Sequence, residues 1–147
     1  MAIAPNVLFV SGAVLTSAQQ NAFGFGIVGY ATNASNVGLT TTVGDLGLSV
    51  TFTAIANRYY KYTFFNYANN GTTSTVLESY VTDASNNIKG QLNMYIVGGA
   101  NYNYQMLTYI STETAGSTTR KVRGKLGAGT GTAYNPLQFW VEDIGPA

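Results

Sequence analysis

Short runs that alternate apolar and hydroxyl-bearing residues constrain this chain more than any other feature of its sequence. The clearest run spans residues 48–54, where Leu, Val, Phe and Ala occupy every second position between Ser and Thr. Successive side chains of a β-strand point to opposite faces, so a period of two predicts a strand with one buried and one solvated face. The run therefore predicts a half-buried strand, since a helix would need apolar residues three and four positions apart.

Similar runs recur along the chain between turns rich in Gly, Asn, Ser and Thr. We predict strands over residues 25–32, 38–43, 48–54, 58–67, 75–83, 88–97, 102–112, 118–126 and 137–144, and a further strand or extended arm over 6–10. The single helix candidate covers residues 16–21, because Thr16 and Gln19 have the spacing of a capping box.

The number and spacing of these segments predict an all-β fold. About eight to nine short strands with turns every 8–12 residues are typical of an antiparallel β-sandwich, here of jelly-roll type, with a closed sheet as the alternative. We expect a single β-sandwich domain over residues 26–147, preceded by an N-terminal arm with at most one short helix over residues 1–25.

Charged residues are scarce, and this limits the possible functions. They make up 9% of the chain, compared with about 25% in an ordinary soluble domain. The net charge of +1 gives no reason to expect nucleic acid as a partner. The chain has no cysteine and no histidine, which removes the thiolate ligands and the commonest general base. We therefore expect no metal, no cofactor and no catalytic residue.

The charge shortage is most pronounced at the N-terminal end. Asp45 is the only charged residue among the first 57. An exposed surface with so few charges limits solubility, so we expect neighbouring subunits to cover much of it and residues 1–25 to form an assembly contact. No basic leader precedes an apolar segment, and no apolar run is long enough to cross a bilayer. Synthesis in the cytoplasm without membrane insertion is the expectation.

Three glycines match the spacing of a dinucleotide-binding fingerprint, but their context does not. Gly24, Gly26 and Gly29 form a Gly-x-Gly-x-x-Gly pattern. A functional fingerprint lies between a strand and the helix whose N-terminus holds the pyrophosphate. Here the helix candidate precedes the glycines and a strand continues after them, which favours ordinary turn and strand glycines.

Carboxylates are too dispersed to predict a hydrolase with any force. Glu142 and Asp143 are adjacent, so on a strand they point to opposite faces. A glycosidase needs two carboxylates facing each other across the scissile bond. Glu78, Asp83 and Glu113 remain as the residues on which that alternative depends.

Tyrosine supplies the strongest candidate for a binding surface. The chain has 11 tyrosines, and two aromatic stretches lie within residues 59–67 and 95–109. A tyrosine ring combines a large apolar area with a hydroxyl, which suits cross-strand ladders, subunit interfaces and stacking on sugars. All three readings stay open for the candidate contact residues, which are Tyr59, Tyr62, Tyr67, Tyr95, Tyr102, Tyr104 and Tyr109.

A short basic run is a second candidate contact. Lys121, Arg123 and Lys125 share one face of a predicted strand, while Arg120 lies on the face of Val122. An anion or polysaccharide contact is one interpretation. A solvated face on an edge strand, or a salt bridge to another subunit, is the favoured one, because no aromatic residue interrupts the run.

Several segments also follow one another in a familiar order. They are residues 14–21, 26–31, 48–54, 82–85, 116–123, 129–132 and the closing segment 141–146. In this order they resemble a family of small β-rich virion proteins of tailed bacteriophages, of the minor tail, fibre or head-decoration type.

The resemblance implies a non-enzymatic structural protein of the virion. Such a protein would be made in the host cytoplasm and would decorate or cement a capsid, or form part of a tail or fibre. Its partners would be itself, as a homotrimer, and other virion proteins of the capsid or tail. The alternative is a receptor-binding module that recognises host-surface polysaccharide through its tyrosine-rich face.

Overall fold

The chain folds into two antiparallel β-sheets packed face to face. The computed structural model describes residues 25–71, 73–99 and 102–147, and these form nine strands and no helix. The strands are β1 Gly26–Asn33, β2 Val37–Leu39, β3 Gly44–Ala54, β4 Arg58–Asn70, β5 Thr75–Asp83, β6 Ile88–Ile96, β7 Asn103–Thr112, β8 Gly116–Leu126 and β9 Gly131–Pro146. The predicted all-β antiparallel sandwich is confirmed, with an architecture consistent with a jelly roll.

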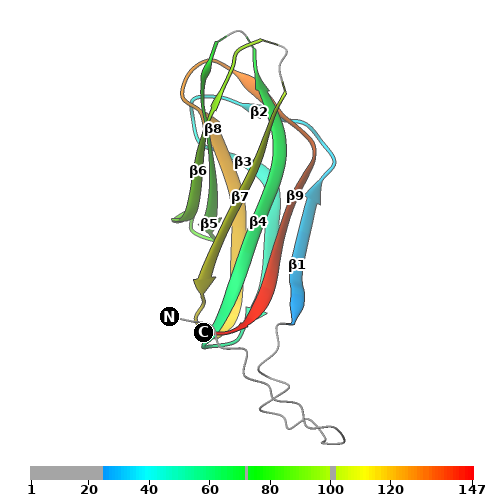
Figure 1. The fold of residues 1–147 in the computed structure, drawn as a ribbon, viewed down its shortest axis with the longest axis vertical. Coiled ribbons are helices and arrows are strands. Elements are labelled where there is room, and N and C mark those ends of the chain that lie inside the picture. The colour runs from blue at the N-terminus through cyan, green and yellow to red at the C-terminus, as the bar shows by residue number, and fades with distance from the viewer. Residues whose placement is uncertain (1–24, 72, 100–101) are drawn as a thin grey trace, which may run out of the picture.

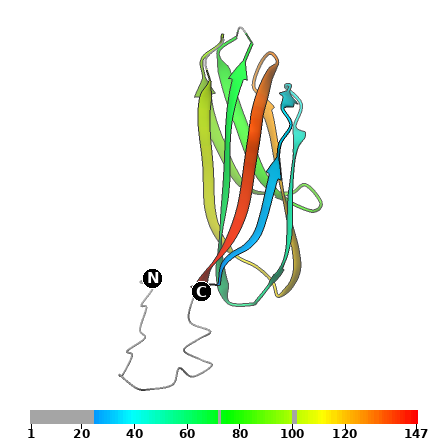
Figure 2. The same cartoon turned by 90° about the vertical axis from the view of Figure 1, so that its right-hand side faces the viewer.

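The two sheets form separate layers of an elongated sandwich, as Figures 1 and 2 show. The five-stranded sheet has the order β1-β9-β4-β7. β2 also pairs with β9, at residues 131–133, whereas β1 pairs with residues 137–143 of the same strand. The four-stranded sheet has the order β3-β8-β5-β6. Strands that are neighbours in a sheet are mostly distant in sequence, so long-range pairing determines which side chains meet.

Alternation along the strands builds the core between the layers. In β3 every second residue from Leu46 to Ala54 is buried, and the residues between them are exposed, as the period of two predicts. Opposite them, Tyr60, Tyr62 and Phe64 of β4 are buried against Phe139 and neighbouring residues of β9. The opposite face of β4 and β9 is turned away from the core, and is called here the outer face.

Polar turn residues explain where strands stop. The predicted strand over residues 38–43 is shorter in the structure, because the Thr40 hydroxyl accepts a hydrogen bond from the Thr42 backbone N–H at 3.2 Å and turns the chain after β2. The predicted turn after β5 is confirmed. There the Asn86 N–H donates to the Asp83 carbonyl, and Asn86 itself takes a φ of 69°.

Three expectations concern parts of the chain that the structure does not describe. The helix over residues 16–21, the strand or arm over 6–10 and nearly all of the assembly contact over 1–25 lie outside the described residues. Across the residues that are described, no helix has the length and apolar character needed to span a membrane.

Candidate functional site

Five aromatic side chains gather on the outer face of the five-stranded sheet. β4 contributes Phe65 and Tyr67, and β9 contributes Tyr134. Tyr104 lies at the start of β7, and Tyr102 is the residue just before that strand. These five residues are called the tyrosine cluster below. They lie toward the C-terminal end of β4, at the top in Figure 1.

Cross-strand pairing brings the rings into contact. Tyr67 lies opposite Tyr104 on one side and Tyr134 on the other. It stacks on Tyr134 with centroids 5.5 Å apart and planes 8° from parallel. Tyr102 meets both rings edge-on, at 5.8 Å from Tyr67 and 5.2 Å from Tyr134. Phe65 stacks on Tyr104 at 6.3 Å. Aromatic contacts of this kind stabilise each other, so the cluster is held in a defined shape.

A bulge in β9 makes this arrangement possible. Phe65 pairs with Gln138 and Tyr67 pairs with Tyr134, so β9 uses three intervening residues where β4 uses one. The extra residues bring the Asn135 carbonyl within 2.8 Å of the Tyr67 hydroxyl, which donates to it. Bulges redirect side chains locally, and this one holds Tyr134 beside Tyr67.

Amide groups surround the rings. The Asn69 amide nitrogen donates to the Tyr134 hydroxyl at 2.9 Å. The Asn36 side-chain oxygen accepts from both the backbone N–H and the side-chain amide of Asn135. These bonds lock the supporting residues, and they leave amide and hydroxyl groups rather than charges beside the aromatic surface.

The surface that results is exposed, aromatic and neutral. Tyr104 is 68% exposed and Tyr102 is 57% exposed. The cluster contains no Lys, Arg, Asp or Glu. The Lys61–Glu142 ion pair on the same face lies four positions along β4 from Phe65, the nearest member of the cluster, about 13 Å by the strand rise. This surface therefore suits a neutral ligand with apolar faces and hydrogen-bonding edges.

The structure brings together only some of the tyrosines that the sequence suggested. Tyr67, Tyr102 and Tyr104 lie in the cluster. Tyr59 lies eight positions before Tyr67 on β4, about 26 Å away by the strand rise. Tyr95 is 66% exposed but belongs to β6, on the outward side of the other sheet.

Two of the predicted contact tyrosines point inward, which corrects their predicted role. Tyr62 is fully buried, and Tyr109 packs against the core and stacks on Tyr62 at 4.6 Å. They face the interior because each is an odd number of strand positions from an outer-face residue. The Tyr62 ring is therefore not available to a glycan or to another subunit in the folded chain, and the partly buried Tyr109 ring is turned away from the outer face.

Sequence reasoning missed Phe65 and Tyr134. Tyr134 stands apart from the other aromatic residues in the sequence, and the following Asn135-Pro136 reads as a break before a strand over 137–144. In the structure β9 begins at Gly131 and carries the bulge at this point. An aromatic residue between Ala133 and Asn135 was the only local signal.

Tyr62 belongs to a buried polar network, and Tyr109 stacks on its ring. The Tyr62 hydroxyl donates to Glu113, which also accepts from Ser111 and forms an ion pair with Arg120. Burial, followed by the hydrogen bond to Glu113, raises the pKa of Tyr62 well above its ordinary value. Burial likewise raises the pKa of Tyr109 to about 12. Both phenols therefore stay neutral at physiological pH and serve packing.

The three carboxylates of the hydrolase alternative lie apart, each beside its own cation. Glu78 pairs with Lys125 on the outward side of β5, Asp83 pairs with Lys89 at the β5–β6 turn, and Glu113 pairs with Arg120. The hydrogen bond from Tyr80, with Lys125, lowers the pKa of Glu78. The Asn87 amide, which donates to Asp83, lowers the pKa of that carboxyl to about 2. A general acid at neutral pH needs the opposite shift.

The basic run lies in the interior of its sheet. Lys121, Arg123 and Lys125 face outward on β8, as predicted, but β8 runs between β3 and β5 and is not an edge strand. The edge-strand interpretation is therefore wrong. Lys125 is 3.1 Å from Glu78, and Arg123 donates to the Val43 carbonyl at 3.1 Å. These contacts within the chain account for two of the three cations.

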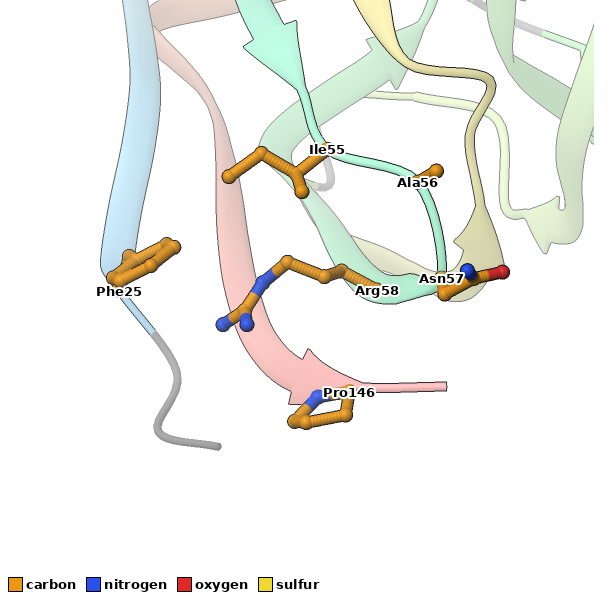
Figure 3. Close-up of a pocket in the computed structure, with 6 residues that line it drawn as sticks. All are labelled: Phe25, Ile55, Ala56, Asn57, Arg58 and Pro146. Atoms are coloured by element: carbon orange, nitrogen blue, oxygen red, sulfur yellow. The ribbon is translucent and has the colours of Figure 1, made fainter. Parts of the chain in front are cut away.

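A pocket of about 310 Å³ lies at the other end of the sandwich, shown in Figure 3. Its lining is Phe25, Ile55, Ala56, Asn57, Arg58 and Pro146. The Arg58 guanidinium lies 4.3 Å from the centre of the Phe25 ring and forms two hydrogen bonds with Asp143, of 2.6 and 2.7 Å. Because Asp143 neutralises this cation, the pocket is not an anion site.

Comparisons with known proteins show similarity at the level of fold. No protein-family model matches the sequence, and no curated protein matches it. Its structure is similar to a tailspike protein domain of bacteriophage CBA120, with 17% identity and a TM-score of 0.37 over 76% of this chain; the match spans 19% of the tailspike chain.

Two carbohydrate-binding modules are similar to a comparable degree. One is the xylan-binding module CBM22-1 of Paenibacillus barcinonensis, at 12% identity and a TM-score of 0.37, covering 81% of this chain and 88% of the module. The other is a family 35 module from an environmental isolate, at 20% identity and a TM-score of 0.37, covering 85% and 96%. At these values the overlap assigns neither a family nor a function, and the resemblance to phage virion proteins stays a prediction.

Proposed function

We propose that this chain is a non-catalytic carbohydrate-recognition domain whose binding surface is the tyrosine cluster. The observation that carries the proposal is the grouping of five aromatic side chains, from β4, β9, β7 and the residue before β7, in one surface patch that contains no charged side chain. Sugar rings present apolar C–H faces that stack on aromatic rings, and hydroxyl edges that bond to amides and phenols. The cluster offers both kinds of contact side by side.

The ligand class follows from the charge of the surface. No acidic or basic side chain belongs to the cluster, and the polar groups next to it are the amides of Asn36, Asn69 and Asn135. A neutral glycan brings no charge that must be desolvated on binding. An anionic glycan would bring a charge and would find no counter-charge on this surface. We therefore expect a preference for neutral polysaccharides over sialylated or sulfated ones.

A non-enzymatic role is part of the proposal. The three carboxylates of the hydrolase alternative are each paired with a cation, and the pKa values of Glu78 and Asp83 are lowered. The tyrosine cluster itself contains no carboxylate. Recognition without cleavage is the reading that these contacts favour.

A glycan array followed by calorimetry tests the proposal. Replacing Tyr104→Ala should weaken binding of the selected neutral glycan by about 30-fold, since truncating an aromatic hot-spot residue costs about 2 kcal/mol. Tyr95→Ala is the matched control, because Tyr95 has nearly the same exposure but lies on the other sheet. Absence of any bound glycan, or an equal loss in both variants, would refute the proposal.

A structural role in a tailed-phage virion is the second candidate. It is favoured by apolar side chains exposed at the end opposite the cluster: Phe25 and Ile55 line the pocket of Figure 3, and Ile27 and Ile144 are exposed two positions along the chain from its lining residues Phe25 and Pro146. A chain anchored there would present the tyrosine cluster outward, so the two candidates are compatible. Exposed apolar patches of this kind mark contacts with other proteins.

Labelling of phage particles distinguishes the second candidate. Antibody against this chain, imaged on virions by electron microscopy, should decorate a head or tail position in a regular pattern. Virions that remain unlabelled, while denatured virion protein also lacks the antigen, would rule out the structural role.

A further inference from the structure

One edge of the five-stranded sheet is built without the usual protection against pairing. Among residues 25–71, 73–99 and 102–147, which the structure describes, β7 pairs with β4 on one side and with no strand of its own sheet on the other. Its ten residues include no Lys, Arg, Asp or Glu. The other edge strands differ, since β6 carries Lys89, β3 carries Asp45 and a register shift, β1 has a register shift at Ile27 and β2 is only three residues long. Natural edge strands are normally blunted by such charges and bulges.

The outward row of β7 is also apolar. Tyr104, Met106 and Ile110 are 68%, 62% and 54% exposed, and Thr108 and Thr112 complete the row. An uncharged strand with large exposed apolar side chains and an open edge is suited to accept another strand.

We infer that the strand it accepts is β7 of a second copy of this chain, paired antiparallel about Thr108. In that register Thr108 faces its own counterpart, and Met106 of each copy lies opposite Ile110 of the other. The two most exposed aliphatic side chains of the row are then buried together twice, and no charge is placed opposite a like charge. A two-fold edge contact closes at two copies, not at the three that the phage resemblance implies.

The symmetry of this pairing has a consequence for binding, which rests on the proposed function. An antiparallel two-fold pairing within one continuous sheet has its axis perpendicular to the sheet. Both outer faces therefore point the same way, and the dimer presents two tyrosine clusters on one surface. In this register Tyr104 of one copy lies opposite Thr112 of the other. The two Tyr104 positions are therefore eight residues, or about 27 Å, apart along the strands. A linear polysaccharide can reach both.

Single-cysteine variants test the pairing and its register, because the chain has no cysteine of its own. Under mild oxidation Thr108→Cys should give a disulfide-linked dimer, since residues opposite each other in an antiparallel pair have Cα atoms about 4.5–5.5 Å apart. Thr112→Cys, on the same row, should not, because its counterpart is about 27 Å away. Equal cross-linking at both positions would overturn the register.

Light scattering tests the assembly without any ligand. The chain should have the mass of a dimer at micromolar concentration. Thr108→Lys should give the mass of a monomer, because it places two like charges opposite each other. The control Thr53→Lys, on an exposed position of β3, should remain a dimer. A monomer or trimer of the unaltered chain would overturn the inference.

Binding to polymer separates the two proposals. Thr108→Lys should keep its affinity for a short soluble oligosaccharide and lose about 10²–10⁴-fold in apparent affinity for the immobilised polysaccharide. If no glycan binds but the dimer mass and the Thr108→Cys cross-link are found, the proposed function fails and the pairing stands. If glycan binds with equal strength to the dimer and to Thr108→Lys on the polymer, bivalent binding is refuted.

Discussion

Replacing Asp143→Ala should lower the free energy of unfolding by about 3–5 kcal/mol, because it leaves the buried Arg58 without its counter-charge. The Asp143 and Arg58 side chains are 1% and 6% exposed, and two short hydrogen bonds join them. The Asp143 carboxylate also accepts from the Gly145 backbone N–H at 3.0 Å. Urea denaturation followed by circular dichroism measures the loss.

The neighbouring residue supplies the matched control. Glu142 pairs with Lys61 at 2.8 Å on the outer face, where both side chains are partly exposed. Glu142→Gln should cost about 1 kcal/mol or less. If Asp143→Ala does not fold, the double variant Arg58→Met with Asp143→Leu should restore a folded chain, since it removes both charges together. Similar losses for Asp143→Ala and Glu142→Gln would contradict the expected difference.

Replacing Phe64→Ala should have an effect of the same size through loss of packing. Phe64 is fully buried at the centre of the five-stranded sheet, opposite Phe139 of β9 and Leu107 of β7. Removing a buried phenylalanine ring costs about 3–5 kcal/mol, from lost apolar burial and from the cavity left behind. The glycan affinity of the molecules that remain folded should be nearly unchanged, because the ring faces away from the tyrosine cluster.

Phe65→Ala should show the reverse pattern. Phe65 lies on the outer face and stacks on Tyr104. Its loss should cost about 0.5–1.5 kcal/mol in stability, the typical worth of an aromatic pair, and should weaken glycan binding measurably. Unfolding and calorimetric titrations on both variants separate the two roles. A stability loss for Phe65→Ala as large as that for Phe64→Ala would contradict the assignment of faces.

Much of the fold was predictable because strand alternation is a local property. The period of two in residues 48–54 predicts which side chains of β3 are buried, and the structure confirms it. The turn at Asn86 follows in the same way from residues that tolerate a positive φ. The opposed faces of Glu142 and Asp143 also follow from their adjacency alone.

The candidate site was only partly predictable, because it is assembled by long-range pairing. Tyr67 and Tyr95 look equivalent in the sequence, yet they lie on different sheets. Tyr62 and Tyr67 share a strand, but only Tyr67 faces outward. Tyr134 joins the cluster through the β9 bulge, which no local pattern announces.

By itself the sequence determined the strand character of the chain, its low charge and the division of each strand into two faces, because each depends on neighbouring residues only. Only the tertiary structure decided that β9 lies between β1 and β4, that β8 is an interior strand and that β7 is an edge. The register between β4 and β9 places Tyr67 beside Tyr134, residues 67 positions apart in the chain. Burial of Phe64 and Phe139 on the other face fixes the register on one side of the β9 bulge, and the bulge shifts it by two residues so that Tyr67 meets Tyr134. Core packing and the bulge together therefore determine the shape of the tyrosine cluster.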